Sequence, residues 1–294
     1  MSDAFTTILI VGGTSGIGEG LARKYHTMGK RVIVTGRRLE RLQALEQELP
    51  GLSIMQLDLL DLPNLPNQVN TLFTTYPTIN AIFLSAGIQQ HLTFTEPDTT
   101  KSTALDDRII TEITTNLTGP ILFARALMTH LLAFPSGSAI GQEQEQGQSS
   151  SSRPRASIFF ITSGLAFVPV RIFPLYSATK AGMHAFALAL RAQMREAGAA
   201  VDVVEIVPPY VDTGLNTAHR EVSERFVGKG VQGMAVEEFV DGVVEGLERR
   251  EREGVELGDK HEGRAVVAVG GAKVAADKWV EAFGPVVRMF GGDV

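Results

Sequence analysis

Short apolar runs alternate with longer helical segments along most of this chain, and this alternation constrains the fold more than any other feature. The strand-like runs lie at residues 7–11, 31–36, 52–58, 80–87, 156–163 and 201–209. The helical segments lie at 18–29, 37–49, 103–133 and 176–198. The strand-like runs are apolar on both faces, which is typical of a parallel sheet covered by helices on each side. The alternation therefore predicts a doubly wound α/β fold (Rossmann fold) with three layers, in a single domain spanning 1–294.

Two segments depart from this rhythm. Residues 135–155 are rich in Ser, Gln and Gly and have no apolar period, which predicts a flexible low-complexity insertion at the surface. A linker between two domains is the alternative, although both flanks continue one alternating pattern. A last strand-like run precedes a helical tail at 270–294 that carries the only tryptophan, Trp279. We expect this tail to pack against the core or a partner subunit rather than to lie on a membrane.

Composition narrows the class of protein. The 294 residues carry a net charge of −6 with no basic face, which argues against a nucleic-acid-binding protein. Because the chain has no cysteine, disulfides, cysteine nucleophiles and thiolate metal sites are excluded. The six histidines lack metal-binding spacing, so we expect no metal site. No stretch approaches the roughly 20 apolar residues of a membrane span, and no signal peptide is apparent, so we expect a soluble, cytoplasmic protein.

A glycine-rich turn, "VGGTSGIGEG", follows the first strand and opens the first helix. Glycine permits a tight turn and a close approach of backbone N–H groups to a phosphate, and the helix N-terminus adds a positive dipole end. A glycine motif alone is weak evidence, but its place between a strand and a helix predicts a dinucleotide-binding site. The turn residues expected at the cofactor are Gly12, Thr14, Ser15, Gly16, Ile17 and Gly18.

The end of the second strand indicates which dinucleotide binds. An acidic residue there would accept hydrogen bonds from a ribose 2′-hydroxyl and repel a 2′-phosphate. This chain has Gly36 at that position, followed by Arg37 and Arg38, whose guanidinium groups match a phosphate. We therefore predict NADP(H) rather than NAD(H) as the cofactor. Asp58 and Leu59, at the end of the third strand, are also expected at the cofactor, and Asp58 is a candidate for holding the adenine or for an ordinary turn role.

Three motifs together resemble the short-chain dehydrogenase/reductase family. They are "GGTSGIG" at 12–18, a serine at 163, and "YSATK" beginning thirteen residues later. The likeness covers about residues 6–245, and the stretch from "TSGLAFVP" to "VPPYVDTGLN" more closely resembles the DltE-like oxidoreductase branch. Each motif is modest alone, but the combination is highly specific.

The resemblance implies a catalytic group of four residues. Tyr176 would be the general acid or base, and Lys180, one turn along the same helix, would lower the pKa of Tyr176 and hold the nicotinamide ribose. Ser163 would bind the substrate oxygen, and Asn116 would hold a water that relays protons to Lys180. The chemistry agrees, because a protein that assists hydride transfer must polarise one oxygen and move one proton. The alternative is four ordinary structural roles, such as a turn-capping serine and a half-buried tyrosine.

Some positions depart from the family's pattern. Val11 replaces the usual threonine before the first glycine, and "LSAG" at 84–87 replaces the usual Asn-Asn-Ala-Gly. These two family elements brace one another, so both ends of the brace have changed. We still expect Ala86 and Gly87 to approach the adenosine ribose through their backbone.

The sixth strand ends in two prolines, where the family usually has Pro-Gly and the DltE-like branch also has Pro-Pro. The resemblance places Pro208 at the cofactor, the backbone of Val211 at its carboxamide, and Thr213 at the carboxamide or a phosphate. Residues 210–235 mix charges with glycines and are expected to form a substrate lid, with a plain surface loop as the alternative.

We therefore expect an NADP(H)-dependent oxidoreductase that reduces a small carbonyl compound or oxidises a secondary alcohol. The apolar stretch at 165–174 leaves room for an apolar or aromatic substrate, or else packs as a loop. Two alternatives remain: a cofactor-bound enzyme of this family with redox-neutral chemistry, and a nucleotide-binding scaffold without turnover. The resemblance also implies a homodimer or homotetramer that associates through 103–133 and the helix of Tyr176.

Overall fold

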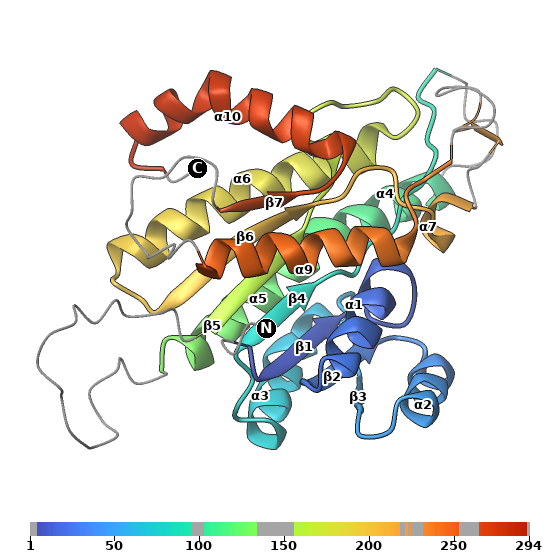
Figure 1. Cartoon of the computed structure of the whole chain (residues 1–294). Helices are drawn as coiled ribbons and strands as arrows, with labels where there is room; N and C mark the ends of the chain where they lie inside the picture. Colours follow the sequence, from blue (N-terminus) through green and yellow to red (C-terminus); the bar gives the residue numbers. More distant parts are fainter. Residues whose placement is uncertain are drawn as a thin grey trace, which may run out of the picture.

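The computed structural model describes residues 5–95, 103–133, 156–217, 221–222, 224, 232–252 and 265–292. These ranges form one sheet with helices on both faces (Figure 1). The insertion expected at 135–155 lies outside the described residues. Part of the expected lid, at 218–220, 223 and 225–231, lies outside them too.

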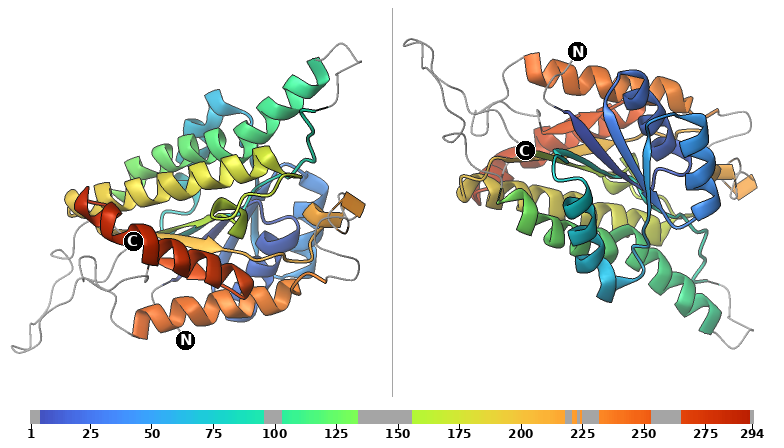
Figure 2. Two further views of the ribbon diagram at one scale, coloured as in Figure 1. Left: turned by 90° about the horizontal axis from the view of Figure 1, so that it is seen from above. Right: turned by 90° about the horizontal axis from the view of Figure 1, so that it is seen from below.

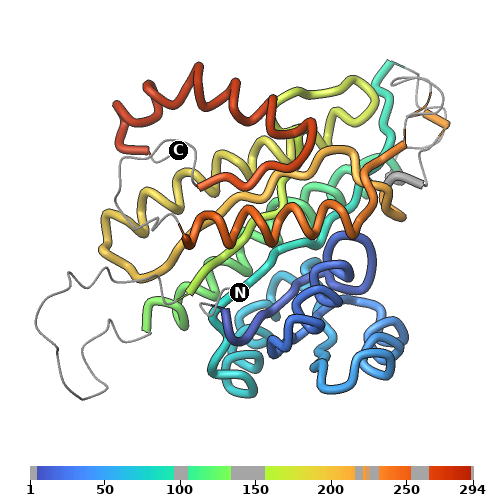
Figure 3. Tube along the Cα trace, in the orientation of Figure 1, coloured from blue at the N-terminus to red at the C-terminus, as the bar shows by residue number. Residues whose placement is uncertain are grey.

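Seven parallel strands form the sheet in the order β3-β2-β1-β4-β5-β6-β7. The strands are β1 (Thr7–Val11), β2 (Arg31–Gly36), β3 (Ser53–Gln56), β4 (Ala81–Leu84), β5 (Ala156–Ile161), β6 (Val201–Val207) and β7 (Val266–Ala268). The chain builds one half of the sheet outward from β1 and then returns to build the other half, as the colours along the trace show (Figure 3). The order reverses between β1 and β4, which is the topological switch point of this fold class. The predicted doubly wound α/β fold is confirmed.

Helices cover both faces of the sheet (Figure 2). The elements are α1 (Gly16–Thr27), α2 (Leu39–Glu48), α3 (Leu65–Thr75), α4 (Thr103–Ile113), α5 (Gly119–Leu131), α6 (Pro174–Glu196), α7 (Gly214–Thr217), α9 (Val236–Arg252) and α10 (Gly271–Met289), with the short turns η1 (Leu62–Asn64), η2 (Thr114–Thr118) and η3 (Gly164–Ala166). Helices α3, α5 and α6 pack on one face, and α1, α2 and α9 on the other. Within the described ranges, no helix combines the length and apolar character needed to cross a membrane.

The apolar strands serve two cores at once. Successive side chains of a strand point to opposite faces of the sheet. Along β1, Leu9 and Val11 belong to the core under α3, α5 and α6, whereas Ile8 and Ile10 belong to the core under α1, α2 and α9. This division explains why the strands are apolar at every position rather than at every second one.

The segment 103–133, expected as one helix, is α4, the π-helical turn η2 and α5 in succession. Pro120 accounts for the irregular turn, because it has no N–H to donate to the carbonyl of Asn116 four residues earlier. The N–H of Gly119 bonds instead to the carbonyl of Thr114, which is the five-residue spacing of a π turn. The sequence pattern thus predicted the helix but not the irregularity at Asn116.

The stacked pair of Phe159 on β5 and Phe83 on β4 should be a major support of the core. Phe159 is fully buried, and the two ring centroids lie 4.2 Å apart. Phe159→Ala is expected to lower the free energy of unfolding by about 3–5 kcal/mol, because the core cannot refill the space. Urea denaturation followed by circular dichroism measures this loss.

The matched control for this substitution is Phe290→Ala, at the exposed end of α10. Its ring is 86% exposed, so truncation should change the free energy of unfolding by less than about 0.5 kcal/mol. Equal losses for the two variants would contradict the role of Phe159 in the core.

Candidate active site

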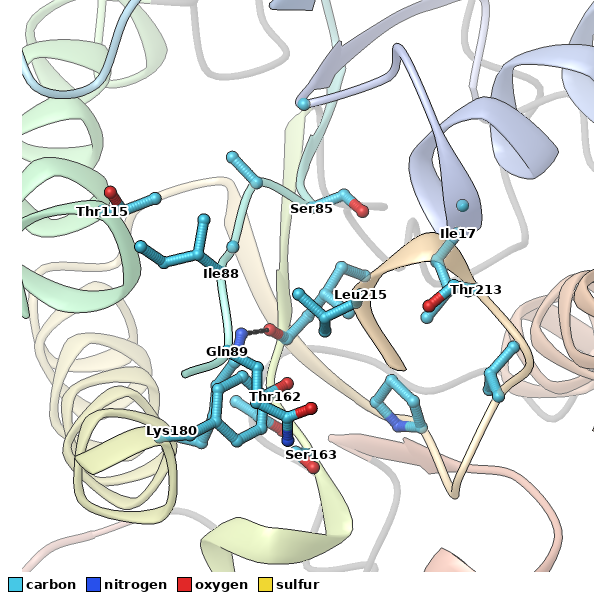
Figure 4. Close-up of a pocket in the computed structure, with 18 of the residues that line it drawn as sticks. Ile17, Ser85, Ile88, Gln89, Thr115, Thr162, Ser163, Lys180, Thr213 and Leu215 are labelled. Atoms are coloured by element: carbon cyan, nitrogen blue, oxygen red, sulfur yellow. Dashed lines mark hydrogen bonds between the residues drawn. The ribbon is translucent and has the colours of Figure 1, made fainter. Parts of the chain in front are cut away.

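A pocket of about 800 Å³ opens at the carboxyl edge of the sheet, where ligands bind in open α/β folds. Figure 4 shows Ser163 and Lys180 toward one end of this pocket, and Ile17 and Thr213 toward the other. The residues predicted from the sequence that line it are Gly12, Thr14, Ser15, Gly16, Ile17, Arg37, Arg38, Asp58, Leu59, Ala86, Gly87, Ser163, Tyr176, Lys180, Pro208, Val211 and Thr213.

Close backbone contacts shape the glycine turn after β1. Gly12 has a φ of +86°, and a Cβ there would lie 2.5 Å from the backbone of Ala86. The N–H of Ser85 donates a 2.9 Å hydrogen bond to the carbonyl of Val11, so backbone groups join the two segments whose family side chains have changed. Gly18 does not line the pocket; a Cβ on it would lie 2.4 Å from the Gly12 carbonyl oxygen. Its role is therefore to let α1 begin directly beneath the turn.

The N-terminus of α1 is open toward the pocket. Ser15 is the N-cap residue, yet its side chain makes no capping hydrogen bond to α1. Its hydroxyl instead accepts a 3.0 Å hydrogen bond from Arg38, which also donates to the Thr14 hydroxyl at 2.9 Å. Because the first N–H groups of a helix have no partner within the helix, they can bind a phosphate here. The residues present thus fit the diphosphate of a dinucleotide.

The end of β2 has no room for an acidic side chain. A Cβ on Gly36 would lie 2.7 Å from the methyl group of Thr14. Arg37 and Arg38 line the pocket here, and Arg41 in the first turn of α2 lines it as well. Arg41 was not predicted, although it lies only three residues after Arg38, the N-cap residue of α2. The guanidinium groups give this end of the pocket the chemistry of a phosphate site.

Asp58 and Leu59 follow β3 and line the same end of the pocket as the arginines of the β2 end. Asp58 Oδ1 accepts a 3.0 Å hydrogen bond from the N–H of Leu60, so its carboxylate folds back on its own turn. The turn role that the sequence left open for Asp58 is therefore present, and its contact with an adenine stays a prediction.

Both ends of the expected lid are anchored beside the pocket. Val211 pairs with Met234 in an isolated parallel bridge, which ties the chain after β6 to the chain before α9. Thr213 lies against the glycine turn, because a Cβ on Gly16 would come within 3.3 Å of its side chain. The anchoring places Val211 and Thr213 between the turn after β1 and the end of β6.

Ser163, Tyr176 and Lys180 come together at the end of β5. The Ser163 hydroxyl caps η3 by accepting a 3.1 Å hydrogen bond from the N–H of Leu165. Tyr176 and Lys180 are one turn apart on α6 and only 7% and 5% exposed. Lys180 Nζ donates a 2.8 Å hydrogen bond to the carbonyl of Ile161 and lies 5.5 Å from the centroid of the Tyr176 ring. The arrangement places a hydroxyl, a phenol and an amine on one wall.

Burial dominates the acid–base properties of this group. It raises the pKa of Tyr176 above its usual value, and the nearby Ser163 hydroxyl offsets only part of the rise. It lowers the pKa of Lys180 to about 8, against the charges of Glu112 and Glu205. The sequence suggested a lowered pKa for Tyr176, but the direction is the opposite because a buried tyrosinate loses its hydration. Lys180 still carries its proton at neutral pH.

Asn116 holds the chain after β4 in place. Its Oδ1 accepts from the N–H of Ile88 and its Nδ2 donates to the Ile88 carbonyl, both at 2.8 Å. Asn116 is buried and does not line the pocket. It is nevertheless close to Lys180, since a Cβ on Gly87 would lie 3.4 Å from Asn116 Oδ1 and 3.7 Å from Lys180 Nζ. The bound water expected at Asn116 stays a prediction.

A buried polar network lies behind the pocket wall. Thr162 donates a 2.6 Å hydrogen bond to Glu205, whose other oxygen lies 2.8 Å from His184 Nδ1. Trp279 of α10 packs edge-on against His184, with ring centroids 4.5 Å apart. The sequence did not predict this network; its one signal was an acidic residue inside the apolar strand β6. No group of three or more His, Cys, Asp or Glu in the described ranges could hold a metal ion.

Much of the remaining wall is apolar, and part of it comes from the stretch at 165–174, which the sequence predicted either at this cleft or in loop packing. Gln89 lies among these side chains, and three residues of α10 join the wall from nearly 100 positions beyond Tyr176. No local sequence pattern marks such long-range contacts. The apolar residues of this wall are Ile88, Leu165, Val168, Val170, Ile172, Phe173, Leu215, Ala272 and Ala275.

Comparisons with known proteins show the family to which the chain belongs. The family model for short chain dehydrogenase matches residues 6–224. The chain is 33% identical over 247 residues to the uncharacterized oxidoreductase DltE of Bacillus subtilis, covering 84% of this chain and 86% of that protein. It is 32% identical over 206 residues to the NADP-dependent 3-hydroxy acid dehydrogenase YdfG of Salmonella typhi, covering 69% and 72%.

A solved structure shares the fold. A short chain dehydrogenase/reductase from Burkholderia phymatum in complex with NAD aligns with a TM-score of 0.71 at 15% identity, covering 97% of this chain and 96% of that chain. The chain therefore belongs to the short-chain dehydrogenase/reductase family, and DltE is a relative within it. The resemblance inferred from the three motifs is confirmed.

The clamp between Asn116 and Ile88 predicts the effect of an isosteric change. Asn116→Asp keeps an acceptor for the Ile88 N–H but replaces the donor to the Ile88 carbonyl with a second oxygen. We expect the free energy of unfolding to fall by about 1–3 kcal/mol, because a partly buried carbonyl loses its partner and faces a second oxygen. Chemical denaturation measures the change, with Asn70→Asp on the exposed side of α3 as the control. An Asn116→Asp variant as stable as this control would contradict the clamp.

Proposed function

We propose that this protein is an NADP(H)-dependent oxidoreductase that interconverts a small carbonyl compound and a secondary alcohol. The observation that carries the proposal is the convergence of Ser163, Tyr176 and Lys180 on one wall of a pocket that the glycine turn also lines. Membership of the short-chain dehydrogenase/reductase family supports oxidoreductase chemistry.

The residues divide the chemistry between them. A bound nicotinamide would supply the hydride in reduction and accept it in oxidation. In reduction, the Tyr176 hydroxyl donates its proton to the substrate oxygen, which the Ser163 hydroxyl holds in place. The ammonium group of Lys180 stabilises the tyrosinate that remains, because its pKa of about 8 keeps it charged at neutral pH. In oxidation, Tyr176 accepts the proton. The apolar wall excludes water from this exchange.

Three features support NADP(H) as the cofactor. The Thr14 methyl fills the space that an acidic side chain at Gly36 would need. Arg38 is held by Thr14 and Ser15 at the glycine turn, where the adenosine ribose of a dinucleotide would lie. YdfG, a relative, is named as NADP-dependent. A 2′-phosphate would meet Arg37, Arg38 or both.

The proton-transfer role is tested by Tyr176→Phe, which removes only the hydroxyl. We expect kcat for carbonyl reduction to fall by a factor on the order of 10²–10⁴, because the substrate oxygen loses its proton donor. The dissociation constant for NADPH should stay within about twofold, since the ring remains in place. The rate is measured from the absorbance of reduced nicotinamide across a panel of carbonyl compounds.

The same panel separates the proposal from its alternatives. Tight NADPH binding with no nicotinamide oxidation by any compound would favour a scaffold. Conversion of a compound with no net change in nicotinamide would favour redox-neutral chemistry. A fully active Tyr176→Phe variant would refute Tyr176 as the proton donor.

Cofactor preference is tested by Arg38→Ala and Arg37→Ala. Loss of a charged hydrogen bond to a 2′-phosphate should weaken NADPH binding about ten- to hundredfold and leave NADH binding nearly unchanged. Isothermal titration calorimetry with both nucleotides measures the ratio. Arg249→Ala, an exposed arginine on α9, is the matched control. Equal losses for NADPH and NADH in both variants would overturn the NADP(H) assignment.

The proposed homodimer or homotetramer has a candidate surface on α4 and α6. Ile110 on α4 is 60% exposed, and Ala185 and Ala189 on α6 are also exposed. Small and apolar side chains on neighbouring helices support close packing of a second subunit. The oligomeric state and the cytoplasmic location both stay predictions.

A further inference from the structure

Glu112, near the end of α4, is a fully buried carboxyl group that the proposed reaction does not use. Its side chain is 0% exposed, and neither carboxyl oxygen reaches hydrogen-bond geometry with another group of the described ranges. The N–H of Gln90 is close enough to favour the charged form, but it lies outside that geometry. A buried acid without hydrogen bonds is unfavourable and calls for an explanation.

Neighbouring contacts fix the position of Glu112. One helical turn before it, Arg108 donates a 2.7 Å hydrogen bond to the side chain of Gln90. One turn after it, Asn116 binds both backbone groups of Ile88. Residues four apart lie on the same face of a helix, so Glu112 is held between these two contacts against the chain after β4. Its burial is therefore imposed by the elements that build the active-site wall.

Lys180 is a buried cation on the neighbouring helix α6. Helix α4 packs against α6, and the charge of Glu112 is the strongest influence that keeps the pKa of Lys180 from falling further. Glu205 is the second such charge, but both of its oxygens already contact Thr162 and His184. Among these two carboxylates, Glu112 is the one whose oxygens have no other partner.

We propose that Glu112 is the buried counter-charge of Lys180 and a positioning residue for proton transfer at Tyr176. It acts through these two side chains and touches neither substrate nor cofactor, and the inference rests on the roles proposed for them. When Glu112 is ionised, its charge holds the proton on Lys180 and opposes ionisation of Tyr176. When Glu112 is protonated, both effects are lost.

The pKa values of Glu112 and Lys180 place the titration of both groups near neutral pH. Burial raises the pKa of Glu112 to about 7, while the Gln90 N–H and the charges of Arg108 and Lys180 oppose the rise. The pKa of Lys180, lowered to about 8, lies just above it. Tyr176 is the third titratable group that responds to the Glu112 charge. Removing that charge therefore lowers the pKa of both Lys180 and Tyr176.

The kinetic test is Glu112→Gln, which keeps the shape of the side chain and removes its charge. In carbonyl reduction, the alkaline limb of kcat/KM against pH reports loss of the Lys180 proton, because the pKa of Lys180, about 8, lies below that of Tyr176. This limb should move to lower pH by about one unit, the size of effect expected from a nearby buried charge. Asp107→Asn removes an exposed charge from the same helix and should leave the profile unchanged. A Glu112→Gln profile that coincides with the wild-type profile would overturn the proposal.

An infrared titration of the protein without cofactor follows the protonation of Glu112 directly and does not depend on turnover. The wild-type protein should show a carboxylic acid C=O band that disappears as the pH rises through about 7, and Glu112→Gln should lack this band. A band that persists above about pH 8 would refute the inference, because Glu112 would then carry no charge at the pH where Lys180 titrates. The band together with no turnover of any substrate would refute the proposed function and leave the charge pair intact.

Discussion

The burial of the Lys180 amine is the constraint on which the active site depends. An ammonium group that loses its water is stable only beside dipoles and opposite charges. Lys180 finds the carbonyl of Ile161, the last residue of β5, at 2.8 Å. This hydrogen bond ties α6 to the end of β5, and it therefore brings Tyr176 on the helix to Ser163 just after the strand. The position of the proton donor follows from the way the lysine is accommodated.

The opposite wall depends on positions where no Cβ can be placed. Gly12 lies against the backbone of Ala86, and Gly18 lies against the carbonyl of Gly12. The first contact brings the turns after β1 and β4 within backbone contact of each other. The second does the same for the glycine turn and the start of α1. Gly36 extends the same principle to cofactor choice, because Thr14 fills the space beside it and Arg38 binds the Thr14 hydroxyl. The packing of Thr14 against Gly36 thus excludes an acidic side chain there and also holds Arg38 where a phosphate would bind.

Much of the fold and the pocket could be predicted from local patterns. The all-apolar strands predicted a sheet buried on both faces, and the glycine turn, the arginines after β2 and the Tyr-Lys pair all line one pocket. Other features had no local signal. Pro120 interrupts an apparently regular helix at Asn116, and the direction of the Tyr176 pKa shift depends on burial by distant elements.

The sequence by itself determined the order of the strands and of most helices, because hydrophobic periodicity and glycine positions act over a few residues; α3 and α9 were not among the expected segments. It also determined which chemical groups the strand ends carry. Only the tertiary structure decided which charges share a buried space. Glu112 and Glu205 are both buried acids, yet Glu205 binds Thr162 and His184, while the oxygens of Glu112 have no hydrogen-bond partner and its charge acts on Lys180. Charge pairing of this kind depends on distance and dielectric across elements far apart in the chain, which no local pattern encodes.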